Sequence, residues 1–151
     1  MDDVLVKDAF WKAVKHYTKD NQYKCVETQD LKKSVEEVTG QNLDWFFQQW
    51  LFEPGFPKYD VKWTYNQRNK SIKLNVKQVQ DGPLFKMPIK VKIDEMDQTI
   101  WVEDKEAIFE IPSKKRPELV IFNSGQIVPS ELTFNKPISE WILQLENSTH
   151  I

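Results

Sequence analysis

Cysteine is nearly absent from this sequence, since Cys25 is the one thiol in 151 residues. A single cysteine cannot form an internal disulfide, so packing alone must stabilise the fold. Apolar runs are also short, and none approaches the roughly 20 residues of a membrane-spanning helix. The N-terminus lacks the basic, then apolar, then small-residue pattern of a signal peptide. The sequence therefore predicts a protein that neither spans a membrane nor is targeted to one.

Residues that carry enzyme chemistry are equally scarce. The two histidines, His16 and His150, lie far apart, and neither an H-E-x-x-H nor a Cys-x-x-Cys spacing occurs, although zinc sites are marked by such spacings. The four glycines are isolated, which excludes a phosphate-binding loop. We therefore expect no catalytic, metal-binding or cofactor-binding residue in this chain. His16 is predicted to lie on a solvated helix face, and Cys25 to be a small core residue.

The composition is that of a compact globular protein, with 40% hydrophobic and 29% charged residues. A net charge of −2 argues against a nucleic-acid partner. Lysines do recur in the middle of the chain, but they alternate with apolar residues and no aromatic residues interleave with them. This pattern indicates the solvated outer face of a sheet rather than a nucleic-acid-binding surface.

Helical periodicity is confined to the first 53 residues, and all eight prolines lie at or beyond Pro54. A first, amphipathic helix is predicted from apolar residues at helical spacing, namely Val6, Phe10, Ala13, Val14 and Tyr17. A second helix is expected to begin at the N-cap Thr28 and to end at Gly40. Asn42 is expected to cap a third helix. Residues 1–53 are therefore predicted to form a helical segment.

From residue 59 onward the apolar period changes to two, which is typical of half-buried strands. Residues 59–65 and 72–76 are predicted to form a hairpin around the turn N-Q-R-N-K. Five further short strands are expected, at 87–93, 99–102, 107–111, 119–122 and 131–134. Seven strands with little helix between them predict an antiparallel β-sandwich over 54–136, followed by a helix over 137–151. The predicted fold class is therefore α+β.

The stretch N-L-D-W-F-F-Q-Q-W-L-F-E-P-G-F-P, residues 42–57, holds six aromatic residues. In a regular helix, Trp45 and Phe52 lie opposite an apolar stripe made of Leu43, Phe46, Phe47, Trp50 and Leu51. A helix that is apolar on two sides is expected to lie between two bodies. Either the sandwich or a part outside this chain would cover its second side. The prolines around Gly55 end this helix, and they predict a short, stiff joint at 53–57.

Several short motifs occur in a fixed order along the chain. They are Phe10-Trp11, the pair of Thr28–Leu31 and Gly40 around the second helix, F-Q-Q-W at 47–50, P-G-F-P at 54–57, and Gln78 with Gln80 on one strand. In this order, residues 9–66 and 72–80 resemble the segment of aminopeptidase N-like zinc metallopeptidases that ends the catalytic domain and enters the β-sandwich. Residues 120–148 are similar to the family's connection from the sandwich to its helical C-terminal domain. Phe56 is a departure, because many relatives carry histidine there.

The resemblance implies a hydrolase that removes N-terminal residues from peptides with one zinc ion. In that family, H-E-x-x-H and a later glutamate hold the zinc, a Gly-x-Met-Glu-Asn loop grips the substrate amine, and a tyrosine stabilises the oxyanion. All of these motifs would precede Asp2, so no catalytic or metal residue is carried over to this chain. The resemblance assigns 1–53 to the end of the catalytic domain, 54–136 to a sandwich that braces it, and 137–151 to the start of the helical domain. We therefore expect an inactive fragment, with zinc only in the parent enzyme.

Under this interpretation, the partners are the missing catalytic and helical domains, and peptide substrate is bound only through the parent. Self-association through the aromatic, helical end is also expected, because monomers rarely leave large apolar patches uncovered. One alternative is a free-standing helical and β-sandwich module that binds a protein partner through the aromatic helix. Another is a carbohydrate-binding module that uses Trp63 or Trp101, although Trp63 shares its strand face with core residues. An H-E-x-x-H motif encoded upstream favours the fragment, and a natural start codon favours the free-standing module.

Overall fold

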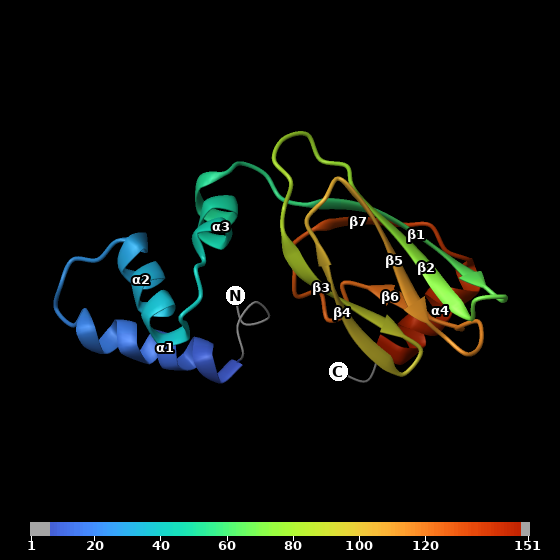
Figure 1. Ribbon diagram of the computed structural model, residues 1–151, viewed down its shortest axis with the longest axis horizontal. Coiled ribbons are helices and arrows are strands. Elements are labelled where there is room, and N and C mark those ends of the chain that lie inside the picture. Colours follow the sequence, from blue (N-terminus) through green and yellow to red (C-terminus); the bar gives the residue numbers. More distant parts are fainter. Residues whose placement is uncertain (1–6, 149–151) are drawn as a thin grey trace. The chain divides into compact units, whose positions relative to one another are not determined.

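The computed structural model describes residues 7–148, which divide into two compact units (Figure 1). The first unit extends to Pro54 and is helical. The second begins at Gly55 and contains two β-sheets and a final helix. The predicted α+β class, with N-terminal helices, a β-sandwich and a C-terminal helix, is confirmed.

The helical unit contains α1 (Lys7–Asp20), α2 (Thr28–Thr39), the short α3 (Asp44–Phe47) and the π-helical turn η1 (Gln48–Phe52). Its core is small and consists of four fully buried residues, Ala13, Val35, Leu43 and Phe47. Partly buried side chains such as Phe10 and Leu31 pack around them. Ala13 lies on the predicted apolar face of α1, whereas the predicted Val6 lies outside the described residues.

The residues that flank α2 cap both of its ends. The N-cap is Glu27 and not the predicted Thr28. The backbone N–H of Glu27 donates to Asp30 Oδ2 at 2.8 Å, so the carboxylate in the first turn satisfies this end of the helix. At the other end, Gly40 adopts a left-handed φ of 68°, and its N–H donates to the carbonyl of Glu36 at 2.7 Å. The predicted stop at Gly40 is confirmed.

The cap of α3 also differs from the prediction, because Leu43 and not Asn42 is the N-cap residue. Asn42 still contributes, since its Oδ1 accepts the backbone N–H of Asp44 at 2.9 Å. An Asx-type contact of this kind fixes the turn just before a helix without the side chain standing at the cap itself.

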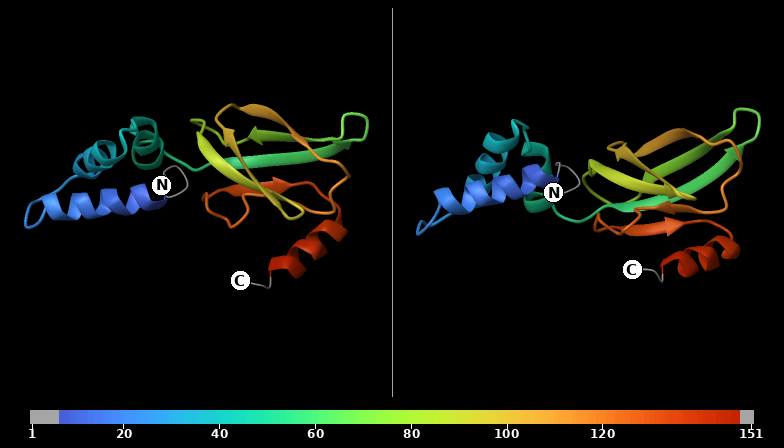
Figure 2. Two further views of the ribbon diagram at one scale, coloured as in Figure 1. Left: turned by 60° about the horizontal axis from the view of Figure 1, so that its bottom comes forward. Right: turned by 90° about the horizontal axis from the view of Figure 1, so that it is seen from below.

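The second unit is a sandwich of two sheets, whose layers are visible in Figures 1 and 2. One sheet has the order β5-β2-β1-β7 and the other the order β4-β3-β6. The strands are β1 (Lys58–Asn66), β2 (Ser71–Gln78), β3 (Met87–Ile93), β4 (Met96–Val102), β5 (Glu106–Pro112), β6 (Val120–Phe122) and β7 (Glu131–Phe134). All seven predicted strands are therefore present.

The apolar residues whose alternation predicted the strands also form the core of the sandwich. On β2, Ile72, Leu74 and Val76 are fully buried, and on β1 Val61 is fully buried between exposed or half-buried neighbours. The ring of Tyr59 packs edge-on against that of Phe122 in the other sheet, with the ring centroids 5.3 Å apart. One pairing departs from the antiparallel prediction, because β7 runs parallel to β1.

The final helix, α4 (Ile138–Ser148), follows Pro137 as predicted and lies beside the sandwich (Figure 2). It carries the predicted stripe of Ile138, Trp141, Ile142 and Leu145. Within the described range 7–148, no helix has the length and apolar character needed to cross a membrane.

Candidate interaction surfaces

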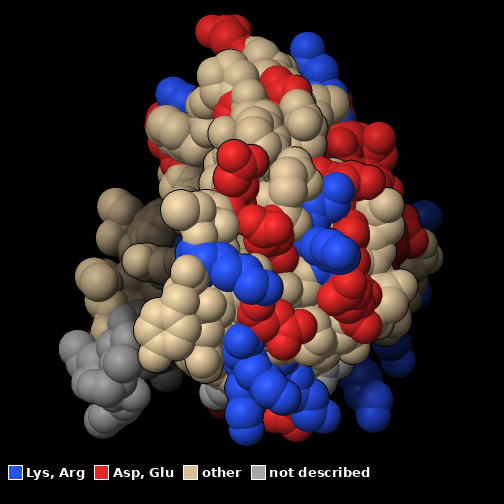
Figure 3. All heavy atoms as spheres, turned by 90° about the vertical axis from the view of Figure 1, so that its left-hand side faces the viewer, with Lys and Arg blue, Asp and Glu red and all other residues tan. Residues whose placement is uncertain are grey.

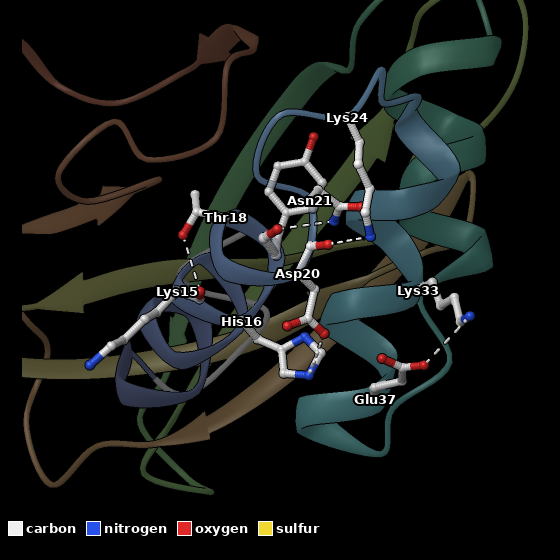
Figure 4. Close-up of polar contacts among 9 residues, drawn as sticks. Lys15, His16, Thr18, Asp20, Asn21, Lys24, Lys33 and Glu37 are labelled. Atoms are coloured by element: carbon white, nitrogen blue, oxygen red, sulfur yellow. Dashed lines mark hydrogen bonds and ion pairs between the residues drawn. The ribbon is translucent and has the colours of Figure 1, made fainter.

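The described part of the chain brings together no set of metal ligands. No group of three or more His, Cys, Asp or Glu side chains in residues 7–148 could hold a metal ion. His16 lies on α1 beside Asp20, with its Nε2 3.5 Å from the Asp20 carboxylate (Figure 4). Its side chain is half-exposed, in agreement with the predicted helix face. A single imidazole beside one carboxylate is a surface contact rather than a ligand set.

Cys25 corrects one sequence prediction. It is exposed, and no disulfide involves it, whereas the sequence predicted a small core residue. The cause is its place in the connection between α1 and α2, after the last residue of α1 and before the cap of α2. A residue in such a connection runs over the surface and is not held on either helix's buried face.

The aromatic segment ends in the π-helical turn η1, which changes which residues are buried. The backbone N–H of Glu53 donates to the carbonyl of Gln48 at 3.0 Å, an i to i+5 bond that widens the turn. Leu43 and Phe47 are buried as predicted, but Leu51 is 57% exposed although it was placed on the buried stripe. Gln49 is buried in its place. The prediction for Leu51 was wrong because a wider turn rotates every later side chain around the helix axis.

Two adjoining hollows mark the surface between α2 and η1. One, of about 420 Å³, is lined by Trp45, Phe47 and the first residues of α2. The other, of about 830 Å³, is lined by Val26, Leu31 and Leu51 together with Tyr17 and the start of α2. Gln29 and Phe52 line both hollows, so together they form one groove, here called the α2–η1 groove.

The rim of the α2–η1 groove carries one ion pair, in which Lys32 Nζ contacts Asp44 Oδ1. The hydrogen bond from Lys32 lowers the pKa of Asp44, and the same bond raises the pKa of Lys32. The pair links α2 to the start of α3 and holds two walls of the groove together. Across the face of the molecule shown in Figure 3, side chains of both charge signs are interleaved with uncharged residues. The lining of the groove itself combines apolar side chains with Glu27 and with the Lys32–Asp44 pair.

Helix α4 is anchored to the sandwich by a polar cluster. The Glu140 side chain is buried, and its Oε2 accepts the indole N–H of Trp63 at 3.3 Å. The Lys136 ammonium donates to the carbonyl of Val120 at 3.1 Å and to Gln144 Oε1, and it lies 4.3 Å from the Trp141 ring centroid. Burial raises the pKa of Glu140 and lowers the pKa of Lys136.

Trp141 of the apolar α4 stripe contacts Lys136 of this anchor, whereas the other three stripe residues are more than half exposed. Ile138 is 78% exposed, Leu145 67% and Ile142 52%. A helix of a globular protein normally buries its apolar stripe and exposes its charges. In α4 the buried residue is instead a glutamate, and sequence periodicity could not reveal this inversion. Trp63 donates its indole N–H to Glu140, and the Arg116 guanidinium carbon lies 5.4 Å from the centroid of the Trp63 ring. These contacts disfavour a carbohydrate-binding platform at Trp63.

A pair of glutamines organises the loop between β2 and β3. The buried Gln78 side chain donates to the carbonyl of Phe85 and accepts the N–H of Phe85, both at 2.8 Å. Gln80 donates to Gln78 Oε1 at 2.9 Å and to the carbonyl of Pro83 at 3.0 Å, and its own Oε1 accepts the N–H of Lys58 at 3.1 Å. The periodicity of apolar residues does not predict that a glutamine is buried. Only the motif resemblance pointed to Gln78 and Gln80.

Comparisons with known proteins place this chain beside two kinds of protein. No family model matches it. A puromycin-sensitive aminopeptidase of Caenorhabditis elegans is 26% identical over 132 residues, which cover 80% of this chain and 14% of that protein. Transcription initiation factor TFIID subunit 2 of Gallus gallus is 27% identical over 100 residues, covering 60% of this chain and 9% of the relative. TFIID subunit 2 of Schizosaccharomyces pombe is 29% identical over 68 residues, covering 45% and 6%.

Among solved structures, the aminopeptidase A of Legionella pneumophila, crystallised with aspartic acid, has the same fold. Its TM-score is 0.79 at 23% sequence identity, and the match covers 91% of this chain and 17% of the enzyme. The predicted resemblance to an aminopeptidase is therefore confirmed, whereas the similarity to TFIID subunit 2 was not foreseen. The chain spans between 6 and 14% of the length of these three relatives.

Proposed function

We propose that this aminopeptidase-like chain is a non-catalytic segment whose β-sandwich braces a peptidase catalytic domain against a helical domain. The observation that carries the proposal is the extent of the fold match, which covers 91% of the chain and so includes both the helical unit and the sandwich. The described residues supply no metal-binding set, so peptide hydrolysis would come from a zinc-dependent part of a longer parent.

The internal organisation of the sandwich suits a bracing role. A brace must keep its shape under load from its neighbours, and here both sheets enclose fully buried side chains while glutamines fix the β2–β3 loop. The exposed stripe of α4 gives a second argument. Because such a stripe is unfavourable in water, we expect the helical domain of the parent to cover it.

A direct test is to read the coding sequence that precedes Asp2. An H-E-x-x-H motif there, followed by zinc-dependent release of N-terminal residues from peptides by the longer protein, supports the proposal. A longer reading frame without that motif contradicts it. The chain of 151 residues alone is expected to release no product from an aminoacyl reporter, with or without added zinc.

The bracing role has its own test in the longer protein. Ile138→Glu places a charge on the most exposed residue of the α4 stripe. If the stripe is covered in the parent, this change should lower the melting temperature of the parent but not that of the 151-residue chain. Gln67→Glu, in the exposed β1–β2 turn, is the matched control for an added charge. Equal melting temperatures for Ile138→Glu and Gln67→Glu parents would contradict the bracing role.

A second candidate is a segment of a TFIID subunit 2-like protein without peptidase activity. Two matches to TFIID subunit 2, at 27% and 29% identity, favour it. The same upstream sequence separates the candidates, because an H-E-x-x-H motif there favours the peptidase segment over this one. Absence of bound zinc in the purified longer protein, measured by elemental analysis, would support it further.

A further inference from the structure

Three loops of the sandwich unit meet around one hollow. They are the β1–β2 turn (67–70), the β3–β4 turn (94–95) and the β5–β6 connection (113–119). The β5–β6 connection is bonded to both turns, because the N–H of Ser113 donates to the carbonyl of Lys70 at 2.8 Å and the N–H of Asp94 donates to the carbonyl of Leu119 at 2.9 Å. Loops that a rigid sheet scaffold positions in this way often carry binding residues.

Two residues of these loops have a left-handed backbone although neither is glycine. The φ angle is 48° at Lys70 and 49° at Asp94. This conformation is unfavourable for a residue with a Cβ atom, so surrounding contacts must hold it. At Asp94 the side chain supplies such contacts, since its Oδ1 accepts the N–H of Glu118 at 2.9 Å and the N–H of Leu119 at 3.1 Å. The loops are therefore held in one arrangement by specific hydrogen bonds.

The hollow between the loops has an apolar lining and a volume of about 680 Å³. Its apolar residues are Ile93, which is buried, Met96, which is 47% exposed, and Pro112. Ligand sites commonly have volumes of about 300–1,000 Å³. A methionine side chain is flexible and polarisable, so it can pack against apolar groups of different shape. An apolar side chain of a ligand can therefore contact Met96.

The same hollow carries more positive than negative charge. Lys70, Lys114 and Lys115 line it and are exposed, and the lining also includes Asp94 and Glu95. Among the described residues, none of these three lysines forms a salt bridge. The Asp94 carboxylate already accepts two backbone N–H groups. The three ammonium groups can therefore pair with carboxylates that a ligand brings, while Glu95 opposes such a ligand.

We propose that this hollow, here called the loop-end site, binds an acidic peptide segment of a partner protein. Carboxylates of the segment contact the three lysines, and an apolar side chain of the segment contacts Met96. The proposal does not rest on the proposed function, because every residue in it belongs to the sandwich unit. A nucleic acid fits less well, since the described residues that line the site include no aromatic ring on which a base could stack.

A fluorescein-labelled peptide of sequence D-E-L-D-E, titrated with the 151-residue chain in fluorescence anisotropy, tests the charged part of the site. Exposed ion pairs are weak and are screened by salt, so binding should weaken at least about fivefold on addition of about 0.5 M sodium chloride. Lys114→Gln with Lys115→Gln should weaken it about tenfold. The matched control, Lys62→Gln with Lys73→Gln, changes exposed lysines of β1 and β2 and should bind like the unaltered chain. Glu95→Gln should tighten binding, because it removes a like charge.

The peptide D-E-S-D-E tests the apolar part of the site. It should bind more weakly than D-E-L-D-E to the unaltered chain, whereas Met96→Ser should bind both peptides equally. Amide chemical shifts of the ¹⁵N-labelled unaltered chain locate the peptide independently of any variant, and they should change at 94–96 and 113–115. Thermal unfolding checks that every variant folds.

Four outcomes overturn the proposal. They are an absence of binding at millimolar peptide, equal losses in the two double-lysine variants, equal binding of the two peptides to the unaltered chain, and shift changes confined to other parts of the chain. An oligothymidine of about ten nucleotides that binds more tightly than D-E-L-D-E also overturns it, because the site would then prefer a nucleic acid.

Discussion

The helical unit and the sandwich carry similar proportions of apolar residues but use them differently. The sandwich buries aliphatic side chains from both sheets, and many of them, such as Ile72, Leu74 and Val91, are fully inaccessible. The helical unit has a hydrophobic core of four buried residues and leaves Trp11, Leu51 and Phe52 more than half exposed. A high aromatic content therefore does not mean that a unit buries its own apolar surface. A unit can be rich in large rings and still depend on surfaces outside itself.

The largest expected effect separates the two units. Residues 55–148 expressed alone should unfold cooperatively in urea, because the sandwich holds its own core. Residues 7–54 expressed alone should show no cooperative transition, because a unit this small with four buried hydrophobic residues lies below what packing alone sustains. Circular dichroism during urea titration measures both. A sharp transition in the isolated helical piece would remove the distinction.

A core truncation should have the next largest effect. Leu74→Ala deletes a fully buried side chain in β2 and should lower the free energy of unfolding by about 2–5 kcal/mol. Leu132→Ala, at a position 36% exposed in β7, is the matched control and should cost much less. Chemical denaturation of both variants gives the comparison. Similar losses would mean that the sandwich core is less tightly packed than its burial indicates.

The glutamine pair gives a more local prediction. Gln78→Ala leaves the N–H and carbonyl of Phe85 without their side-chain partner inside the protein. Removing a hydrogen-bond partner from buried polar groups costs about 1–3 kcal/mol. Amide exchange at Phe85 should accelerate along with the loss of stability. Gln98→Ala, an exposed glutamine of β4, should change neither quantity, and equal effects of the two changes would argue against the clamp.

The smallest expected effect depends on pH and concerns the anchor of α4. Burial raises the pKa of Glu140 above its ordinary value of 4.5, against the hydrogen bond from Trp63 and the charges of Lys136 and Arg116. A carboxyl with a raised pKa stabilises the folded state below its unfolded pKa and loses that contribution as the pH rises through the folded value. Lys136 acts in the opposite direction, because burial lowers its pKa and its contribution to stability therefore rises with pH.

Glu140→Gln should therefore flatten a shallow decline in stability above about pH 4.5, by less than about 1 kcal/mol. Thermal unfolding between pH 4 and pH 8 measures the slope for the variant and for the unaltered chain. Glu118, which lies with Glu140 along one hollow beside α4, provides the control Glu118→Gln. A slope that Glu118→Gln flattens equally would assign the effect to the general charge of this surface.

Much of the fold could be predicted because apolar residues recur with the 3.6-residue period of a helix or the two-residue period of a strand. Alternation placed 87–93 and 131–134 at the bounds that β3 and β7 have in the structure. The predicted end of α2 was right because Gly40 offers a left-handed conformation at low cost. These features depend on neighbours in the sequence, so the sequence alone contains them.

The surfaces could be predicted only in part, because they depend on contacts between distant residues. A wider π-helical turn exposed Leu51, and the 3.6-residue period gives no warning of it. The buried Glu140 is balanced by Trp63, 77 positions earlier, and no local pattern joins the two. Cys25 was misplaced for a similar reason, since a small apolar residue in a connection has no periodic face that fixes its burial.

The parallel pairing of β1 with β7 has a mechanical consequence. The chain enters the sandwich at β1 and leaves it from β7, and the two strands run in the same direction with Lys58 opposite Glu131 and Val61 opposite Phe134. The N–H of Glu131 donates to the carbonyl of Pro57 at 3.1 Å, and the N–H of Asn135 to the carbonyl of Val61 at 3.4 Å. A pull applied through the two flanking segments therefore slides these strands past each other and loads their backbone hydrogen bonds together. Bonds loaded in this shearing geometry must fail as a group, whereas bonds that are unzipped fail one at a time.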